Sequence, residues 1–141
     1  RTGLTVRATT ERELRSEISR SRRYGNPLSV LTVEIGGEGL DDVTPALVAV
    51  SRTLKDNLRW VDILGAWDAR TVVVILPETD SDSARQLAGK LADPLAAVAV
   101  DFGTPSLATG VAQWTAADQP DDLIARARGE TPSTQAAGGD A

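Results

Sequence analysis

Cysteine, histidine and methionine are all absent from the 141 residues of this sequence. The chain therefore cannot form a disulfide, use a thiolate nucleophile or employ histidine as a general acid or base. Zinc sites built on cysteine or histidine are excluded for the same reason, so any metal would be held by oxygen ligands, as Mg²⁺ and Ca²⁺ are. A Ser-His-Asp triad is ruled out because no serine can have a histidine partner.

Positive charge and long hydrophobic runs are also in short supply. The chain has 15 Lys and Arg residues against 20 Asp and Glu residues, a net charge of −5. Non-specific duplex binding requires a basic surface, so we expect no nucleic-acid partner. The apolar runs fall far short of the roughly 20 residues of a membrane span, and no signal peptide is recognisable. We therefore expect a cytoplasmic protein without direct membrane insertion. The missing initiator methionine suggests a domain cut from a longer protein.

The length and composition indicate a single globular domain. Hydrophobic residues make up 41% of the chain and charged residues 25%, which is typical of soluble proteins. A chain of this size can bury a real core without disulfides. Residues 1–128 are predicted to form the domain. Gly, Ala, Ser, Thr and Gln predominate from residue 129 onward, and this composition predicts a flexible tail over 129–141.

Apolar periodicity and turn signals predict alternating helices and strands. Thr10 and Glu13 have the spacing of a capping box at the start of a helix. The link between residues 66 and 71 is so short that it requires an antiparallel hairpin. The prediction is an α+β domain of order αβαββαββα, with a central mixed β-sheet flanked by helices. Helices are expected at 10–24, 44–58, 81–91 and 120–128, and strands at 28–35, 61–66, 71–77, 96–102 and 106–114.

Four segments, in order along the chain, resemble GGDEF domains, the diguanylate cyclases. Residues 2–4 (TGL) are similar to the family's entry motif, and residues 23–31 (RYGNPLSVL) to the lead into its first strand. Residues 62–79 resemble the segment around the GGDEF hairpin, and residues 109–112 (TGVA) a strand near the end. The resemblance covers about residues 2–128 and implies a nucleotidyl-cyclase-like fold.

The residues that the family uses for catalysis are largely missing. The hairpin reads DARTV instead of GGDEF. Asp68 and Ala69 replace the glycines that let the backbone approach the nucleotide. Arg70 replaces a metal-binding acid, Thr71 is uncharged, and only Glu34 remains of the acids that end the first strand. Two-metal phosphoryl transfer needs at least two converging carboxylates. The resemblance therefore implies a degenerate domain that is not an enzyme, without catalytic residues, metal or cofactor. We expect Glu34 and Arg70 to form a salt bridge.

One ligand-binding element of the family is retained. Arg59 and Asp62 have the R-x-x-D form of the family's product-inhibition site, and Lys90 falls where the family often adds a basic residue. The resemblance implies cyclic di-GMP as the ligand. An arginine can donate to O6 and N7 of guanine, and a carboxylate can accept from its N1–H and N2–H. Exposure of both residues side by side would favour binding.

A reading without a ligand remains open for the same residues. Arg59 would then interact with the end of a helix, Asp62 would begin a strand, and internal salt bridges would hold both. The domain would be a protein–protein interaction or dimerisation module, a homodimer or a regulator of neighbouring domains in a larger bacterial signalling protein. Two further patterns are predicted to be structural. Residues 36–39 (GGEG) lack the spacing of a phosphate loop and predict a turn. The three tryptophans are predicted to lie in the core or at the rim of an interface.

Overall fold

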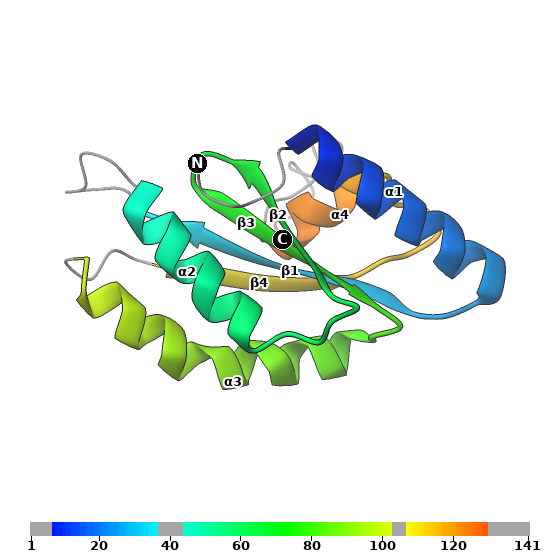
Figure 1. Ribbon diagram of the computed structural model, residues 1–141. Coiled ribbons are helices and arrows are strands. Elements are labelled where there is room, and N and C mark those ends of the chain that lie inside the picture. Colours follow the sequence, from blue (N-terminus) through cyan, green and yellow to red (C-terminus); the bar gives the residue numbers. More distant parts are fainter. Residues whose placement is uncertain (1–6, 37–43, 103–106, 130–141) are drawn as a thin grey trace, which may run out of the picture.

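The computed structural model describes residues 7–36, 44–102 and 107–129. Helices and strands alternate over these residues to give an α+β domain (Figure 1). The expectations for the entry motif at residues 2–4, for the turn at 37–39 and for the tail beyond residue 129 lie outside the described residues. The elements are α1 (Arg7–Tyr24), β1 (Leu28–Ile35), α2 (Thr44–Asp56), β2 (Ile63–Asp68), β3 (Thr71–Pro77), α3 (Ser81–Val100), β4 (Leu107–Gln113) and α4 (Pro120–Ala127).

The four strands form one sheet in the order β2-β3-β1-β4. All pairings among the described residues are antiparallel, so the expectation of a mixed sheet was wrong in this respect. Leu31 in the centre of β1 lies opposite Val74 of β3 and Val111 of β4. A connection of only two residues joins β2 to β3, which is the hairpin that the short link predicts. The pairing leaves β4 at one edge of the sheet.

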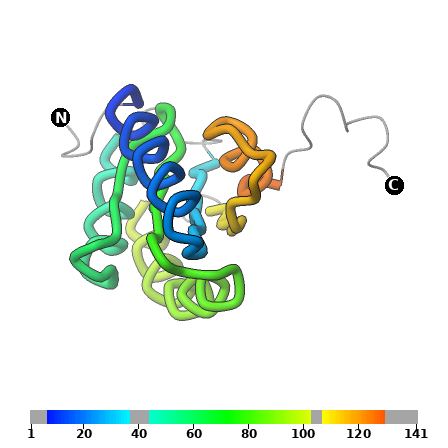
Figure 2. The backbone as a smooth tube through the Cα atoms, turned by 90° about the vertical axis from the view of Figure 1, so that its right-hand side faces the viewer, coloured from blue at the N-terminus to red at the C-terminus, as the bar shows by residue number. Residues whose placement is uncertain are grey.

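Helices cover both faces of the sheet and give the domain two hydrophobic cores. Side chains alternate between the faces along β1, as the period of a strand requires. Val30 packs with residues of α1 and α4, whereas Leu31 packs with residues of α2 and α3. Seen from the side, β4 lies between α4 above and α3 below (Figure 2). Because both faces are buried, most residues of β1 and β3 are apolar.

The predicted strand at 96–102 is wrong, because α3 continues through this segment to Val100. The apolar run looks like a buried strand, and Pro94 looks like a helix stop. In the structure, Leu91, Leu95 and Ala99 recur every four residues and are buried against the sheet. Their burial outweighs the cost of the proline, so the chain makes one helix of 20 residues and one strand fewer.

Two smaller expectations also need correction. Thr10 does not cap α1, since the helix begins at Arg7 and Thr10 is buried within it. The first hairpin strand begins at Ile63 and ends at Asp68, two residues later than expected, with a register irregularity between Ala66 and Asp68. That shift makes Asp68 the last residue of the strand.

Gly110 permits the close approach of α4 to the sheet. A Cβ atom at this position would lie 1.6 Å from the carbonyl oxygen of Ala127 and 2.8 Å from its carbonyl carbon. No side chain can be accommodated there without moving the helix. The glycine of the TGVA segment therefore has a packing role, which brings the end of α4 over β4 and β1.

Candidate functional site: a cavity beside Arg59

The loop between α2 and β2 positions Arg59 beside Asp62. The backbone N–H of Asp62 donates to the carbonyl of Arg59 at 3.0 Å, which closes a tight turn. In return, the backbone N–H of Arg59 donates to Oδ2 of Asp62 at 2.8 Å. These two bonds fix the spacing of the R-x-x-D segment and bring its charged ends to the same side.

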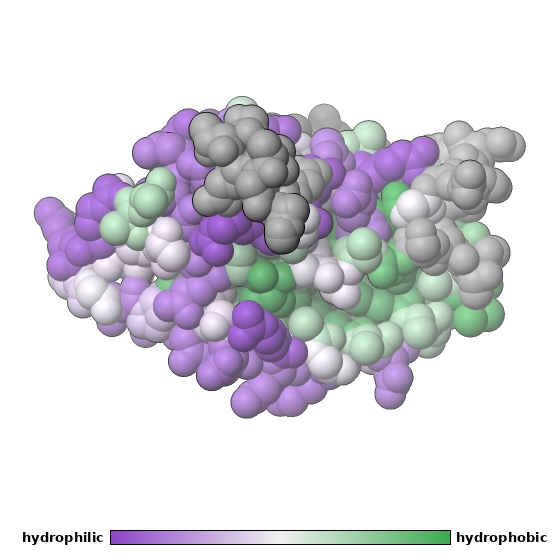
Figure 3. Space-filling model, turned by 180° about the vertical axis from the view of Figure 1, so that it is seen from behind, coloured by the Kyte–Doolittle hydropathy of each residue, from purple (hydrophilic) through white to green (hydrophobic). Residues whose placement is uncertain are grey.

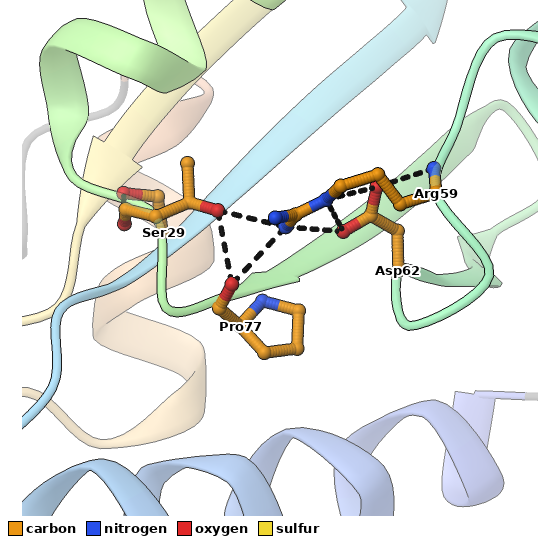
Figure 4. Close-up of polar contacts among 5 residues, drawn as sticks. Ser29, Arg59, Asp62 and Pro77 are labelled. Atoms are coloured by element: carbon orange, nitrogen blue, oxygen red, sulfur yellow. Dashed lines mark hydrogen bonds and ion pairs between the residues drawn. The ribbon is translucent and has the colours of Figure 1, made fainter.

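The guanidinium of Arg59 is held by three different acceptors (Figure 4). Nη2 donates to Oδ1 of Asp62 at 2.8 Å, to the Pro77 carbonyl at 3.1 Å and to Oγ1 of Thr79 at 2.9 Å. Nε donates to both oxygens of Asp62, at 3.2 and 3.3 Å. Within the described part of the chain, no acceptor binds Nη1. The planar group is therefore fixed in orientation while two of its donor hydrogens stay available.

Arg59 and Asp62 differ sharply in exposure. The side chain of Arg59 is 54% exposed, whereas that of Asp62 is only 2% exposed. The hydrogen bond to Asp62 raises the pKa of Arg59 above its ordinary value, against the opposing effect of burial. Asp62 was expected to accept from a guanine, but both of its oxygens accept from Arg59. In this arrangement the carboxylate positions the arginine.

The cavity beside this pair brings the three predicted ligand-binding residues together. Arg59, Asp62 and Lys90 all line it, and its volume is about 310 Å³, at the lower end of the range for small-ligand sites. Lys90 comes from α3, so the cavity lies between that helix and the loop before β2. The rest of the lining is both polar and apolar and consists of Asn57, Leu76, Thr79, Ser83 and Leu87. Ligand binding by these residues stays a prediction.

The β2–β3 hairpin lies at a second polar cluster, and here the expected ion pair is wrong. Glu34 does not pair with Arg70; its Oε2 accepts from Nη2 of Arg128 at 3.1 Å. Nη1 of Arg128 lies 3.6 Å from Oδ2 of Asp68. The guanidinium that bridges the two carboxylates thus comes from the end of α4. Arg70 instead donates from Nη1 to the Ile35 carbonyl at 3.4 Å.

The remaining hairpin positions carry no acid. Ala69 is exposed in the turn, and Thr71 is fully buried, its hydroxyl without a hydrogen-bond partner among the described residues. Within residues 7–36, 44–102 and 107–129, no group of three or more acidic side chains is placed to hold a metal ion. The two carboxylates that do approach each other share Arg128, and a guanidinium fixed between them does not fit a divalent cation at the same place.

Sequence reasoning missed several residues that shape these two sites. No sequence pattern indicates that Arg128 pairs with Glu34, because the two residues are 94 positions apart. Thr79 belongs to the segment that resembles the family, yet nothing in that pattern indicates that its hydroxyl holds Arg59. Asn57 and Ser83 line the cavity only because the loop and α3 meet there.

The tryptophans divide between core and surface. Trp67 is buried, and the guanidinium of Arg7 lies 3.9 Å from the centre of its ring. Trp60, beside Arg59 in the sequence, is 94% exposed. The prediction of core or interface rim is confirmed as core for Trp67, whereas for the exposed Trp60 an interface rim stays a prediction.

None of the described helices combines the length and the apolar character that crossing a bilayer requires.

Comparison with known proteins gives a clear result only at the level of structure. Neither a protein-family model nor a curated protein matches the chain. Among solved structures, the diguanylate cyclase SiaD of Pseudomonas aeruginosa, in complex with its activator SiaC, has a TM-score of 0.78 and 24% identity, over 91% of this chain and 54% of SiaD. The GGDEF domain of DgcB from Caulobacter crescentus, in complex with c-di-GMP, has a TM-score of 0.72 and 13% identity, over 96% of this chain and 87% of that domain. The chain has the fold of a GGDEF domain.

The similarity extends to other GGDEF structures of low sequence identity. The active GGEEF domain of a diguanylate cyclase from Vibrio cholerae has a TM-score of 0.68 and 17% identity, over 88% of this chain and 86% of that chain. The chain spans only about half the length of SiaD. The GGDEF fold confirms the α+β class and the central sheet that the sequence predicts.

Proposed function

We propose that this GGDEF-fold domain is a regulatory module without cyclase activity that binds cyclic di-GMP in the cavity beside Arg59. The observation that carries the proposal is the convergence of Arg59, Asp62 and Lys90 on one cavity from two separate parts of the chain. A neighbouring structure, the DgcB domain, is a complex with c-di-GMP. The proposal places this chain in bacterial cyclic di-GMP signalling, as part of a longer protein.

Arg59 carries the recognition in this proposal. Its free Nη1 can donate to an acceptor on the Hoogsteen edge of a guanine, O6 or N7, because Asp62, Pro77 and Thr79 already hold the other nitrogens. Preorganisation reduces the entropy lost on binding. Lys90 offers a less directional charge that suits a phosphate. Adenine presents an amino donor where guanine presents O6, so cyclic di-AMP should be disfavoured.

The absence of cyclase activity rests on the second cluster. Arg128 lies between Glu34 and Asp68, where metal-dependent phosphoryl transfer would require divalent cations. Asp68 and Ala69 also place side chains where GGDEF domains have glycines. We expect incubation with GTP and Mg²⁺ or Mn²⁺ to yield no cyclic di-GMP above a blank; product above the blank would contradict this.

The alternative, a ligand-free interaction module, is favoured by one observation of its own. Asp62 is tied to Arg59 by an internal ion pair, and its side chain is almost fully buried. The exposure of Arg59 favours the ligand-binding reading, whereas the burial of Asp62 favours the ligand-free one.

Calorimetric titration of the folded domain with cyclic di-GMP tests the proposal. We expect saturable binding that Arg59→Ala weakens by about 1–3 kcal/mol. Arg59→Lys should also weaken it, because an ammonium cannot reproduce the planar group. Arg85→Ala is the matched control, since Arg85 is an exposed arginine of α3 that does not line the cavity. It should bind like the unaltered domain.

The outcomes separate the two readings. No heat up to high-micromolar ligand, and no shift in the resonances of Arg59 and Asp62, would overturn the receptor proposal. Equal weakening by Arg59→Ala and Arg85→Ala would show a general electrostatic effect and would also overturn the assigned site. Circular dichroism of each variant establishes that its fold is retained.

A further inference from the structure

The two halves of α3 differ in what they expose. In the first half, every exposed position except Gly89 is polar or charged, as with Arg85, Gln86 and Lys90. In the second half, Asp93 is the one exposed charged residue, and the other exposed positions are Ala92, Ala96, Ala97 and Val100, with Val100 at 65%. A solvated helix face normally carries polar residues. The second half therefore has the character of a covered surface.

A groove without charged residues lies beside this half of α3. Its volume is about 410 Å³, and one wall is the edge strand β4. From behind, hydrophobic side chains gather over this end of the molecule, while hydrophilic ones cover the opposite end (Figure 3). The lining residues are Ala92, Leu95, Ala96, Ala99, Val100, Leu107 and Thr109.

The outer edge of β4 has free hydrogen-bonding groups. The N–H of Trp114 donates to the Leu28 carbonyl at 2.7 Å, which sets the alternation along the β1–β4 pair. Residues 108, 110 and 112 consequently face β1, and the N–H and C=O groups of Leu107, Thr109 and Val111 point away from it. No strand among the described residues pairs with them.

This edge lacks the usual protection against pairing. Exposed edges are commonly blocked by charged residues, proline or a bulge. The sequence of β4, LATGVAQ, contains no charge and no proline, and its register with β1 is unbroken. An unprotected edge beside an apolar groove indicates a site where another strand adds to the sheet.

We propose that a second copy of this chain occupies the edge, with the two β4 strands antiparallel around a twofold axis. Antiparallel pairing of identical strands is compatible with such an axis, because each strand then offers the same groups to the other. In the register centred on Thr109, that residue lies opposite its own copy, and Leu107 lies opposite Val111 of the partner. The side chains of all three lie on the face that α3 covers, so the pairs are threonine with threonine and leucine with valine, which are favourable across strands.

Charge favours a second copy on this face over other faces. The chain has a net charge of −5, which opposes self-association in general. The groove is lined by uncharged residues, so two copies can meet there without juxtaposing like charges. The paired sheet would continue across eight strands and would bring the apolar halves of the two α3 helices to the same side.

Sedimentation equilibrium from micromolar to millimolar concentration tests the proposal. We expect a reversible dimer. Thr109→Pro removes an outward N–H without removing a bond to β1, and Ala96→Glu places a charge in the groove. Each should raise the dissociation constant of the dimer at least about tenfold. Gln86→Glu adds the same charge to the polar half of α3 and should leave the dimer unchanged.

Hydrogen exchange identifies the face that is used. The amide of Thr109 should exchange more slowly in the dimer than in the monomeric Ala96→Glu variant, whereas the amide of Gly110 should be protected in both. A monomer at all concentrations would overturn the proposal, and so would a dimer that persists in both variants. If Thr109→Pro fails to fold, Ala96→Glu decides alone, since it alters an exposed helical position.

Discussion

Replacing Gly110 by alanine tests how α4 is held against the sheet. The added methyl carbon would lie 1.6 Å from the Ala127 carbonyl oxygen, so α4 would have to retreat by about 2 Å to restore ordinary contact. That movement would separate the buried side chains of Leu123 and Ile124 from their core. Overpacking of this kind costs typically about 1–3 kcal/mol, and the involvement of backbone places the expected loss near the upper end, about 3 kcal/mol.

Gly89 provides the matched control for the same substitution. It lies within α3, is exposed, and has no atom within 4 Å of the position that a Cβ would take. Gly89→Ala should therefore stabilise the domain by about 0.5–1 kcal/mol, since alanine favours the helix. The free energy of unfolding from urea denaturation gives both values. A loss of less than about 1 kcal/mol for Gly110→Ala, or a loss for Gly89→Ala, would refute the reasoning.

Two further substitutions test the polar clusters. Asp62→Asn removes the charge that holds Arg59, so we expect weaker binding of cyclic di-GMP in calorimetry and a loss of about 1 kcal/mol in stability; unchanged affinity would contradict the positioning role. Arg128→Gln frees Glu34 and Asp68 from their shared cation, so it should bind Mn²⁺ at least about tenfold more tightly than the unaltered domain in electron paramagnetic resonance titrations. Equal Mn²⁺ affinity of the two proteins would show that Arg128 does not occupy the site.

The sequence predicts β1 and the β2–β3 hairpin better than it predicts the second half of α3. β1 and β3 are buried on both faces, so their apolar, β-branched runs are unambiguous, and the short link in the hairpin allows only one pairing. The second half of α3 is equally apolar for another reason, because one side is buried and the other is the exposed groove wall. A run of apolar residues does not distinguish these cases, and Pro94 strengthens the wrong interpretation.

The sequence predicts only those parts of the candidate site whose residues lie close together in the chain. Arg59 and Asp62 are three positions apart, and one turn brings them together. The burial of Asp62 depends on how the loop packs and is not encoded in the R-x-x-D pattern. The partner of Glu34 was predicted from the hairpin, yet Arg128 reaches it because Gly110 lets α4 lie close to β4. Ion pairing between distant residues thus follows from helix packing, which the pattern of charges does not reveal.

Asp80 makes the stability of α3 depend on pH. Its carboxylate caps the helix by accepting from the backbone N–H of Ser83 at 2.8 Å, and this hydrogen bond lowers the pKa of Asp80 below its ordinary value of 3.8. A carboxyl group with a lowered pKa in the folded state contributes stability that is present above the unfolded pKa. The contribution is lost as the pH falls through the folded value. Asp80→Ala should therefore lower the Tm most at neutral pH, and the difference from the unaltered domain should narrow in acid, below about pH 3.8.

Thermal unfolding monitored by circular dichroism from neutral pH into acid measures this difference. Asp82→Ala is the control, because Asp82 is an exposed acid of the same first turn whose Oδ1 lies 3.5 Å from Nη1 of Arg85. It should change the Tm less at neutral pH than Asp80→Ala does. A Tm difference for Asp80→Ala that stays constant across the acid range would show that the cap does not depend on the charge of Asp80. Because α3 contributes Lys90 to the cavity and the apolar wall to the groove, loosening its first turn should weaken both sites together.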